Sequence, residues 1–229
     1  TMGALHDGHL ALVKQAKTLG NPVVVSIFVN PLQFAPGEDL DAYPRTLAED
    51  VEKLKAQGVE AVFAPTPETM YPHGPRTTIH PGPLGQVLEG ATRPTHFAGV
   101  LTVVAKLFAL TGAADAFFGE KDYQQLALIR QMVDDLHLPV RIRGCPIVRD
   151  TDGLALSSRN RYLSAEERTV ALAIPRALAT GSLAEARSLL DATEGLHLDY
   201  LVATAEDMSE LPDGYTGPAR PVSYTHLRA

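Results

Sequence analysis

The sequence predicts an α/β protein in which a doubly wound parallel sheet is followed by a smaller α+β domain. Two short runs, 22–29 and 59–64, are nearly continuous in apolar and β-branched residues, as is typical of strands buried on both faces of a parallel sheet. Helical patterns alternate with these runs, and that alternation implies a right-handed, doubly wound arrangement. Later in the chain two Ala- and Leu-rich segments replace this pattern. We therefore predict two domains, 1–147 and 148–229, with a hinge between them.

The first elements of the larger domain are predicted from the signals at their ends. Apolar residues at helical spacing follow the stretch His6–His9 and predict a helix, which the Gly-Asn-Pro turn at 20–22 brings to an end. Thr46 and Glu49 have the spacing of a capping box, which predicts a helix ending near Gly58. The glycine-bearing turn before the first helix would normally follow a strand, but only two residues precede it. Either the sequence is a fragment, which we favour, or the first strand of the sheet is gone.

Proline and glycine interrupt the pattern between residues 65 and 92. We expect an irregular excursion there, with a short strand at 77–80 and a single helical turn at 84–88. Regular alternation then returns until the end of the larger domain. The expected elements are helices at 100–110 and 123–136 and strands at 114–118, 139–143 and 146–149.

The smaller domain is predicted mainly from two further capping boxes. Ser164 with Glu167, and Ser182 with Glu185, place a hydroxyl and a carboxylate three residues apart before an Ala- and Leu-rich segment. The expected elements are helices at 165–179 and 183–193 and a strand at 198–203.

Composition argues against several classes of protein. The 229 residues carry a formal net charge of −7, which argues against a general nucleic-acid surface, so an anionic ligand must be bound by cations gathered locally. No apolar run approaches the roughly 20 residues that a membrane-spanning helix needs, and no signal peptide is visible. Cys145 is the one cysteine, so no internal disulfide is expected. We expect a cytoplasmic protein that binds neither nucleic acid nor membrane.

His6 and His9 stand at the predicted start of the first helix, separated by Asp7 and Gly8. Free N–H groups and the positive end of the helix dipole favour a bound anion there. Two imidazoles three residues apart can share one helical face, and a glycine between them lets the backbone approach a ligand closely. The pattern favours phosphate binding, while a metal-binding pair or two incidental surface histidines are the alternatives.

Polar residues also follow the predicted strands, at the ends where parallel sheets bind ligands. Asn30 and Gln33 stand among apolar residues after the run 22–29, which suits a small hydroxy acid with methyl groups, although an ordinary strand-to-loop exit explains them equally well. Lys121 occupies a strand–helix turn, as phosphate-binding lysines do, and the neighbouring carboxylate of Asp122 could hold ribose hydroxyls.

The stretch 154–164, Leu-Ala-Leu-Ser-Ser-Arg-Asn-Arg-Tyr-Leu-Ser, brings two hydroxyls next to two guanidiniums. With the His-x-Gly-His motif and the stretch 117–125, it makes the chain resemble the pantothenate synthetase (pantoate–beta-alanine ligase) family of nucleotidyltransferases. The histidine motif alone would not separate this family from other nucleotidyltransferases or class I aminoacyl-tRNA synthetases. The matching stretches are 1–12, 26–34, 41–46, 93–107, 117–131 and 153–163.

The resemblance implies a Rossmann-like fold, a homodimer and a two-step ligation that uses MgATP. The pantoate carboxylate attacks the α-phosphate to give pantoyl adenylate and pyrophosphate, and the amine of beta-alanine then displaces AMP. A carboxylate is already a nucleophile, so catalysis needs positioning and charge stabilisation rather than a general base. The resemblance also implies a strand after Pro218, but 221–229 has no match in the family, so we expect the small domain to lack an edge strand.

The resemblance assigns a role to each candidate residue. The residues expected to be catalytic are His6, His9, Lys121, Ser157, Ser158 and Arg159. ATP is expected to contact these six together with Met2, Gly3, Gly119, Asp122 and Val148. Pantoate is expected to contact Asn30, Gln33, Tyr43, Arg93 and Gln125, the last chosen over its neighbour Gln124 because at most one of the two should face the site. Asp50 is the candidate Mg²⁺ ligand, although an acid in the first turn of a helix is equally explained by the helix dipole.

Three other functions compete with this prediction. An adenylyl- or cytidylyltransferase with another acceptor would make a stable nucleotide product and consume no amine. A fragment of an aminoacyl-tRNA synthetase would need an RNA-binding appendage and a basic face. A non-catalytic nucleotide-binding module would be expected to lose one of the phosphate-binding groups, yet all are present. Release of pyrophosphate that depends on both pantoate and ATP separates these functions in one assay.

Overall fold

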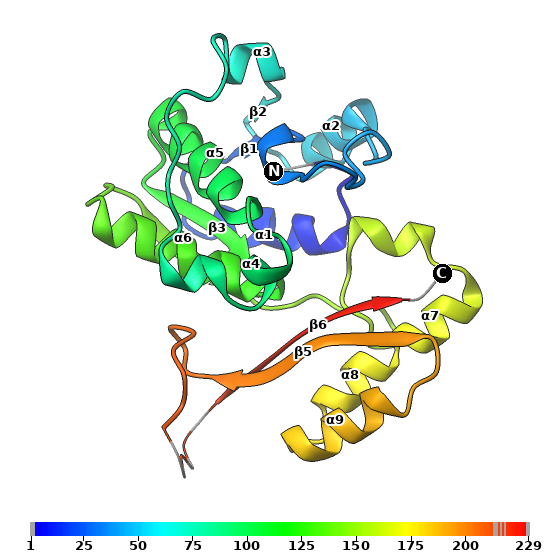
Figure 1. Ribbon diagram of the computed structural model, residues 1–229. Coiled ribbons are helices and arrows are strands. Elements are labelled where there is room, and N and C mark those ends of the chain that lie inside the picture. Colours follow the sequence, from blue (N-terminus) through cyan, green and yellow to red (C-terminus); the bar gives the residue numbers. More distant parts are fainter. Residues whose placement is uncertain (1–2, 213–214, 216, 218, 228–229) are drawn as a thin grey trace. The chain divides into compact units, whose positions relative to one another are not determined.

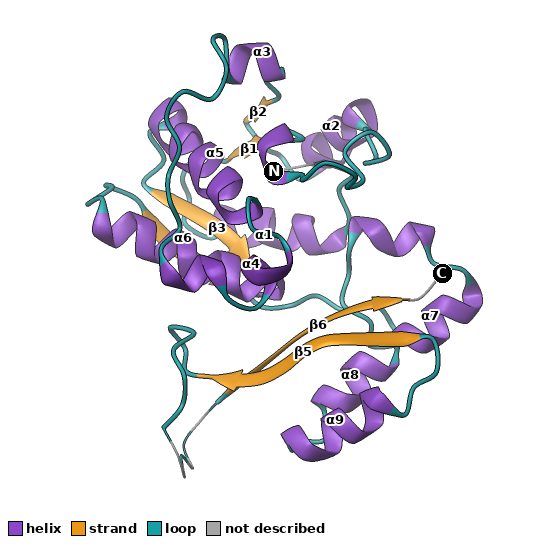
Figure 2. Cartoon of the chain, viewed as in Figure 1, coloured by secondary structure: helices purple, strands orange, loops and turns teal. Residues whose placement is uncertain are grey.

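The structure is a computed structural model that describes residues 3–212, 215, 217 and 219–227 of the chain. Helices and short strands follow one another along the chain (Figure 1), and helices make up most of its regular structure (Figure 2). The chain divides into two compact units, Thr1–Ile147 and Val148–Ala229. No described helix is long and apolar enough to cross a membrane.

The first unit contains strands that pair in parallel. β1 (Val24–Ser26) pairs with β2 (Ala61–Phe63), and β3 (Asp115–Gly119) pairs with β4 (Arg141–Cys145). The paired residues run from Val24 with Ala61 to Ser26 with Phe63, and from Asp115 with Arg141 to Gly119 with Cys145. Parallel strands joined through helices confirm the predicted α/β class. Within the described ranges no strand joins the two pairs, so the predicted single sheet consists of two two-stranded sheets.

Helices and short turns fill the rest of the first unit. The α-helices are α1 (Asp7–Lys17), α2 (Leu47–Ala56), α3 (Pro67–Met70), α4 (Glu89–Thr92), α5 (His96–Thr111) and α6 (Tyr123–Asp135). The 3₁₀ turns are η1 (Pro31–Gln33), η2 (Pro83–Gln86) and η3 (Glu120–Asp122).

Two apolar clusters explain how these helices cover the strands. The larger cluster joins α5 and α6 to aromatic side chains that include Phe28, Phe63 and Phe118. The smaller cluster joins α1 and α2 to β1 and β2, with Leu54 fully buried and Val62 packed against it. Adjacent residues of β2 therefore belong to different clusters, because successive side chains of a strand point to opposite faces. Each face of β2 is covered by different helices, as a doubly wound fold requires.

The second unit combines short helices with an antiparallel ribbon. Its elements are η4 (Ser158–Tyr162), α7 (Ala165–Ala171), α8 (Ala173–Leu178), α9 (Leu183–Asp191), β5 (Leu196–Thr204) and β6 (Arg220–Leu227). β5 and β6 pair from Leu196 with Leu227 to Thr204 with Arg220. The core of this unit is formed by small and aliphatic side chains, among them Ala177 and Leu190.

Three predictions about strands and helices are wrong. The small domain does not lack a strand after Pro218, because Arg220–Leu227 forms β6. No strand forms at 77–80, where the N–H of Ile79 donates to the side chain of Thr102 instead. The helix expected at 165–179 is broken, because Pro175 has no N–H to donate to the carbonyl four residues earlier.

Other predictions fail only in part. The expected strand at 146–149 is reduced to one antiparallel bridge between Arg149 and Ala155. Of the expected capping boxes, the one at Ser164 forms completely, and at Ser182 only the hydroxyl bond to the N–H of Glu185 forms. Thr46 caps nothing, because its hydroxyl donates to a carboxylate inside the same helix.

Candidate active site

His6 and His9 cap the turn that carries them through side-chain-to-backbone hydrogen bonds. His6 is the N-cap of α1, and its Nδ1 accepts the N–H of Gly8 at 3.2 Å. The Nδ1 of His9 accepts the N–H of His6, also at 3.2 Å, and the two ring centroids lie 4.1 Å apart. A ring nitrogen that accepts a hydrogen bond carries no proton, so each neutral imidazole is protonated on Nε2. This tautomer places the donor of each ring on the side remote from the cap, which suits donation to a phosphate.

The electrostatic surroundings keep His9 neutral. Burial of the ring, followed by the charge of His6, lowers the pKa of His9 from 6.5 to about 3. The charges of Asp122 and Lys121 also act on this ring, so both residues lie near it. The structure therefore brings the two histidines, Lys121 and Asp122 into one region of the first unit.

Asp50 braces this turn from α2. Its carboxylate is fully buried and accepts the N–H groups of Ala4 at 2.8 Å and Leu5 at 2.7 Å, together with the Thr46 hydroxyl at 3.2 Å. Ala4 has φ of 51°, a conformation that residues with a side chain rarely adopt, and these bonds hold it there. Both carboxylate oxygens are occupied, and among the described residues no three His, Cys, Asp or Glu side chains gather as metal ligands. Asp50 therefore holds the backbone of this turn, and its predicted Mg²⁺ role stays a prediction.

Two glycines predicted to face ATP have different surroundings. Gly3 has φ of +85°, and a Cβ there would lie 3.0 Å from Ile27 and 3.2 Å from the Asp50 carboxylate, so no larger residue fits without adjustment. A Cβ at Gly119, at the end of β3, would meet no atom within 4 Å. The backbone of Gly119 is therefore open to a ligand. Met2, which was predicted beside Gly3, lies outside the described residues.

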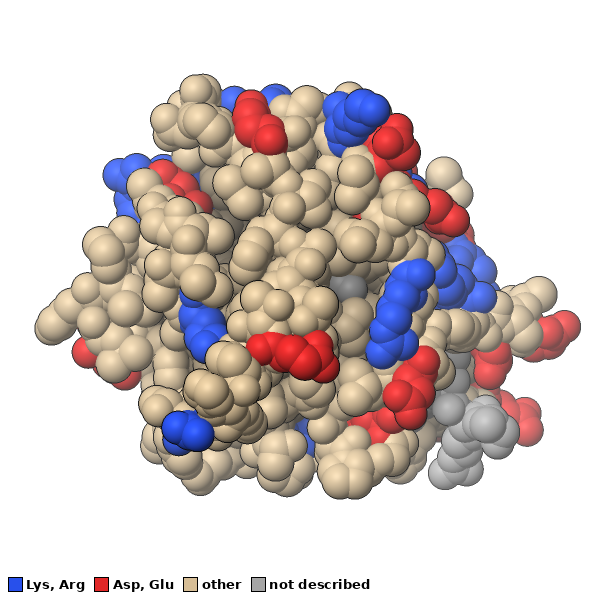
Figure 3. Space-filling model, turned by 90° about the horizontal axis from the view of Figure 1, so that it is seen from above, with Lys and Arg blue, Asp and Glu red and all other residues tan. Residues whose placement is uncertain are grey.

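Lys121 and Asp122 form an ion pair of 2.9 Å in η3, with side chains that are 41% and 56% exposed. An exposed pair of this kind contributes only about 0–1 kcal/mol, so Lys121 can exchange its partner for a phosphate at little cost in stability. On the face shown in Figure 3, basic side chains lie among acidic ones rather than in one basic patch.

The candidate residues of the second unit lie on one turn. Ser157 caps η4 by accepting the N–H of Arg159 at 3.3 Å, and Ser158 is buried while Arg159 is exposed. The carbonyl of Val148 accepts the N–H of Leu156 at 3.0 Å, so Val148 lies next to the strand-like segment that leads into this turn. Val148, Ser157, Ser158 and Arg159 are thereby brought together within their unit.

Gln33 is anchored through both its backbone and its side chain. Its carbonyl accepts from Nη2 of Arg93 at 3.1 Å and lies 3.0 Å from Nδ1 of His96. Its Oε1 accepts from Nδ2 of Asn30 at 3.2 Å. Gln33 is only 8% exposed, so a substrate that reached it would meet a fixed amide.

Asn30 was predicted to contact pantoate, but its amide is committed to the protein. It has no exposed surface, and its Nδ2 donates to Gln33 and to the carbonyl of Gly99 at 3.1 Å. Its Oδ1 accepts the N–H of Leu32 at 3.3 Å and the hydroxyl of Tyr71 at 2.9 Å. All four hydrogen-bonding positions of the amide are used within the protein, one of them by Gln33, and contact with pantoate stays a prediction.

Arg93 was also predicted to contact pantoate, and it too holds protein groups. Its guanidinium donates to Glu38 at 2.7 and 3.0 Å, to Glu89 at 3.0 Å and to the Gln33 carbonyl at 3.1 Å. These bonds use four of its five N–H groups. The hydrogen bond from Arg93 lowers the pKa of Glu38, which therefore stays charged. Sequence reasoning missed these two carboxylates, because neither belongs to a recognisable motif.

The remaining pantoate candidates are Gln125, beside its neighbour Gln124, and Tyr43. Gln124 is buried, donates to the carbonyls of Leu84 and Val87 at 2.8 Å each, and accepts the N–H of Glu89 at 3.2 Å. Gln125 is half-buried and makes no side-chain hydrogen bond within the described part of the chain, so of the adjacent pair it is the one available to a ligand. Tyr43 is buried and meets Phe34 edge to face at 6.0 Å, as part of an apolar wall.

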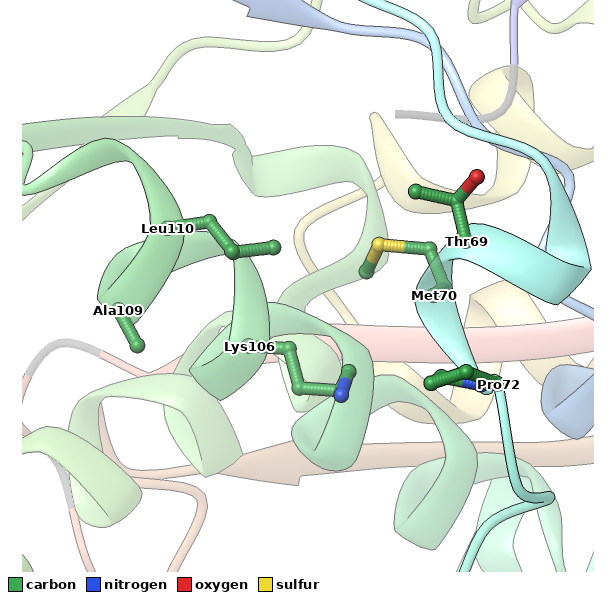
Figure 4. Close-up of a pocket in the computed structure, with 6 residues that line it drawn as sticks. All are labelled: Thr69, Met70, Pro72, Lys106, Ala109 and Leu110. Carbon is green, nitrogen blue, oxygen red and sulfur yellow. The ribbon is translucent and has the colours of Figure 1, made fainter.

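A pocket of about 280 Å³ lies apart from all of these residues, between α3 and the C-terminal part of α5 (Figure 4). It is lined by Thr69, Met70, Pro72, Lys106, Ala109 and Leu110. Lys106 is its single charged group, and none of the predicted site residues reaches it. Its lining offers no set of donors for a nucleotide, so it is not the candidate site.

Several known proteins are similar to this chain in sequence and in fold. The pantoate-beta-alanine ligase family model matches residues 1–219. The pantothenate synthetases of Corynebacterium jeikeium and Nocardia farcinica are 62% and 63% identical over 93% of this chain, which covers 73% and 70% of their lengths. The crystal structure of pantothenate synthetase from Thermus thermophilus is 46% identical and superimposes with a TM-score of 0.93 over 99% of this chain and 87% of that one. A pantoate-beta-alanine ligase from Francisella tularensis, solved with beta-gamma ATP and beta-alanine, is 36% identical with a TM-score of 0.82 over the same shares. The chain therefore belongs to the pantoate-beta-alanine ligase family, whose members catalyse the ATP-dependent formation of pantothenate.

Proposed function

We propose that this chain joins pantoate to beta-alanine in two steps through an enzyme-bound pantoyl adenylate. In the first step a pantoate carboxylate oxygen bonds to the α-phosphorus of ATP, and the bond to the bridging oxygen breaks, so pyrophosphate leaves. In the second step the beta-alanine nitrogen bonds to the acyl carbon, AMP leaves with the electrons of the C–O bond, and the nitrogen loses a proton. The observation that carries the proposal is the pair of capped imidazoles, His6 and His9, with Lys121 nearby.

The family resemblance assigns six donors to the phosphates. His6, His9 and Lys121 belong to the first unit, and Ser157, Ser158 and Arg159 belong to the second. Fixed donors directed at developing charge supply much of the rate enhancement in many enzymes, and the neutral ring of His9 needs no proton exchange to act in this way. The open backbone at Gly119 and the carboxylate of Asp122 are assigned to the ribose, Val148 to the adenine, and Met2 and Gly3 to ATP.

Pantoate would be oriented by two amides. The amide of Gln33 is held in place by Asn30, and the amide of Gln125 makes no hydrogen bond within the described part of the chain. The apolar rings of Tyr43 and Phe34 suit the methyl groups of the acid. Asn30 and Arg93 act indirectly in this proposal, by holding Gln33.

The proposal also includes Mg²⁺ as a cofactor, a homodimer and a cytoplasmic location. Mg²⁺ retains water and prefers phosphate oxygens, so it would enter with ATP rather than occupy a cage of protein ligands, which the described residues do not offer. A homodimer follows from the family resemblance, and light scattering of the purified protein tests it. The single cysteine, Cys145, is free and buried, which suits a reducing compartment such as the cytoplasm.

Quench-flow measurement of pyrophosphate tests the two-step reaction. ATP and pantoate without beta-alanine should release about one pyrophosphate per active site and then stop, because the adenylate stays bound. Addition of beta-alanine should restore turnover and yield AMP. Pyrophosphate that appears only when beta-alanine is present would exclude a separate adenylate step, and release without pantoate would favour a different nucleotidyltransferase.

A further inference from the structure

The orientation of the Asn30 amide is fixed by neighbours that can act in only one way. A backbone N–H can only donate, so the atom of Asn30 that faces Leu32 must be oxygen. A backbone carbonyl can only accept, so the atom that faces Gly99 must be nitrogen. The assignment of Oδ1 and Nδ2 therefore follows from the surrounding backbone, and not from the shape of the side chain alone.

This orientation also determines which end of Gln33 is offered to a ligand. The Asn30 amide nitrogen donates to Gln33 at 3.2 Å, so the Gln33 atom that receives this bond must be Oε1. The Nε2 group of Gln33 makes no hydrogen bond within the described part of the chain, and no buried side-chain nitrogen or oxygen is unpartnered there. Nε2 is therefore accessible, and Gln33 presents an NH₂ donor.

Tyr71 completes the set of bonds from the opposite side. Its hydroxyl donates to Oδ1 of Asn30 at 2.9 Å, across 41 positions of sequence. Burial raises the pKa of the phenol to about 12, so it keeps the proton that it donates. The ring lies 6.3 Å from the Phe28 ring and 5.5 Å from the ammonium of Lys106, which extends from α5 toward Pro72 in Figure 4.

We propose that Tyr71 is a positioning residue for the ligation: its hydroxyl holds the correctly oriented Asn30 amide in place, and Asn30 in turn holds Gln33, which shows its NH₂ to the acid substrate. The proposal rests on the assignment of Gln33 to pantoate. An NH₂ group selects an acceptor, so the atom recognised is a carboxylate or hydroxyl oxygen of the substrate. The contacts join three segments that no local motif connects: the side chains of residues 30–33, the Tyr71 hydroxyl and the backbone carbonyl of Gly99.

Steady-state kinetics of Tyr71→Phe, Gln33→Ala and the double variant test this proposal. Tyr71→Phe keeps the ring and removes only the hydroxyl, so KM for pantoate should rise about three- to tenfold while KM for ATP changes less than about twofold. In the Gln33→Ala background the same substitution should have no further effect on KM for pantoate, because a residue that acts through Gln33 cannot act without it. Lys106→Met is the matched control, since it changes the surroundings of the ring but leaves the hydroxyl.

Each outcome decides between the two assignments. A rise for Gln33→Ala but none for Tyr71→Phe overturns the role of Tyr71 and keeps Gln33 as a pantoate contact. No rise for Gln33→Ala overturns both. Independent, multiplying effects in the double variant, or an equal rise for Lys106→Met, would mean that Tyr71 acts through general packing, which also contradicts the proposal. Thermal melting of each variant identifies any loss of folding.

Discussion

Two turns of the first unit, 3–9 and 30–33, are held in the same way, but one is held by a carboxylate and the other by a neutral amide. In each, a fully buried polar side chain holds the turn from behind, while neighbouring side chains are left to meet a ligand. The first turn is held by the carboxylate of Asp50, which accepts two backbone N–H groups and a hydroxyl. The second is held by the neutral amide of Asn30, which makes four bonds.

The difference has consequences for stability and for binding. Hydrogen bonds to a charged group contribute about 1.5–3 kcal/mol, against about 0.5–1.5 kcal/mol for neutral ones. Damage to the first turn should therefore reduce the stability of the fold as well as the rate. Damage to the second should act mainly on the affinity for one substrate. In both turns the buried polar side chain bonds groups of the protein that lie far away in the sequence.

The largest effect is expected for His9→Asn. An asparagine amide can reach the position of Nδ1 and keep the cap on His6, but it removes the donor at Nε2. We expect kcat to fall about 10²- to 10³-fold, as for loss of one preorganised donor, with little change in the free energy of unfolding. Turnover and chemical denaturation measured on the same preparation check this.

The matched variant is His9→Gln, whose longer amide reaches the position of Nε2 and abandons the cap. It should retain more of the rate and lose about 1 kcal/mol of stability. If the two variants behaved alike, the division between capping at Nδ1 and catalysis at Nε2 would be wrong.

The next effect is expected for Asp50→Asn. The substituted amide keeps one acceptor, but its NH₂ confronts the N–H of Ala4 or Leu5, so a buried donor loses its partner. We expect roughly 2–3 kcal/mol less stability in denaturant unfolding, with a lower kcat because the histidine turn is no longer held. A Mg²⁺ ligand would behave differently: stability would be unchanged or higher, and only the Mg²⁺ concentration needed for activity would rise.

Gly99→Ala tests the second turn. A Cβ at Gly99 would overlap the carbonyl of Leu32, so η1 must move away from α5. We expect a loss of about 1–3 kcal/mol in stability and a higher KM for pantoate, with KM for ATP unchanged. Ala109→Gly, on the exposed side of the same helix, is the control, and it should weaken the helix without altering either KM. Equal changes in both KM values would show that the second turn is not specific to pantoate.

The features that could be predicted from the sequence are those that depend on residues close together in the chain. The histidine turn was found because capping and the start of α1 are local, and β1 to β4 were found because buried parallel strands are short apolar runs. The roles of Asp50 and Asn30 were not predictable in this way, because the groups that they hold lie 45 and 46 residues away for Asp50 and up to 69 for Asn30. A single sequence shows that such a residue is polar, but not that it is buried.

The error at the C-terminal end has another origin. The stretch 220–227, Arg-Pro-Val-Ser-Tyr-Thr-His-Leu, has the β-branched and aromatic residues of a strand, although it has no match in the family. Strand pairing depends on backbone bonds and a suitable partner, and β5 supplies that partner. Local propensity was the better guide here.

The smallest effect is expected from pH, and it acts on both turns. The pKa of His9 is 6.5 as a free group and about 3 in the folded chain, mainly because the ring is buried. The unfolded chain therefore binds this proton more tightly, so the contribution of neutral His9 to stability is complete above pH 6.5 and is lost as the pH falls from 6.5 toward 3. In the second turn burial and Arg93 lower the pKa of His96 as well, so that turn also weakens in acid.

Comparison of the wild type with His9→Asn isolates the contribution of the first turn, because His96 and the carboxylates are common to both proteins. When the pH falls from 7 to 5, the wild type should lose on the order of 1 kcal/mol more unfolding free energy than the variant. Only the wild type carries a buried histidine that stays neutral in the folded chain and gains a proton in the unfolded chain. Urea unfolding at the two pH values measures it. A difference that is independent of pH would mean that His9 titrates normally in the folded chain, and the neutral Nε2 donor assigned to it would then be wrong at pH 5.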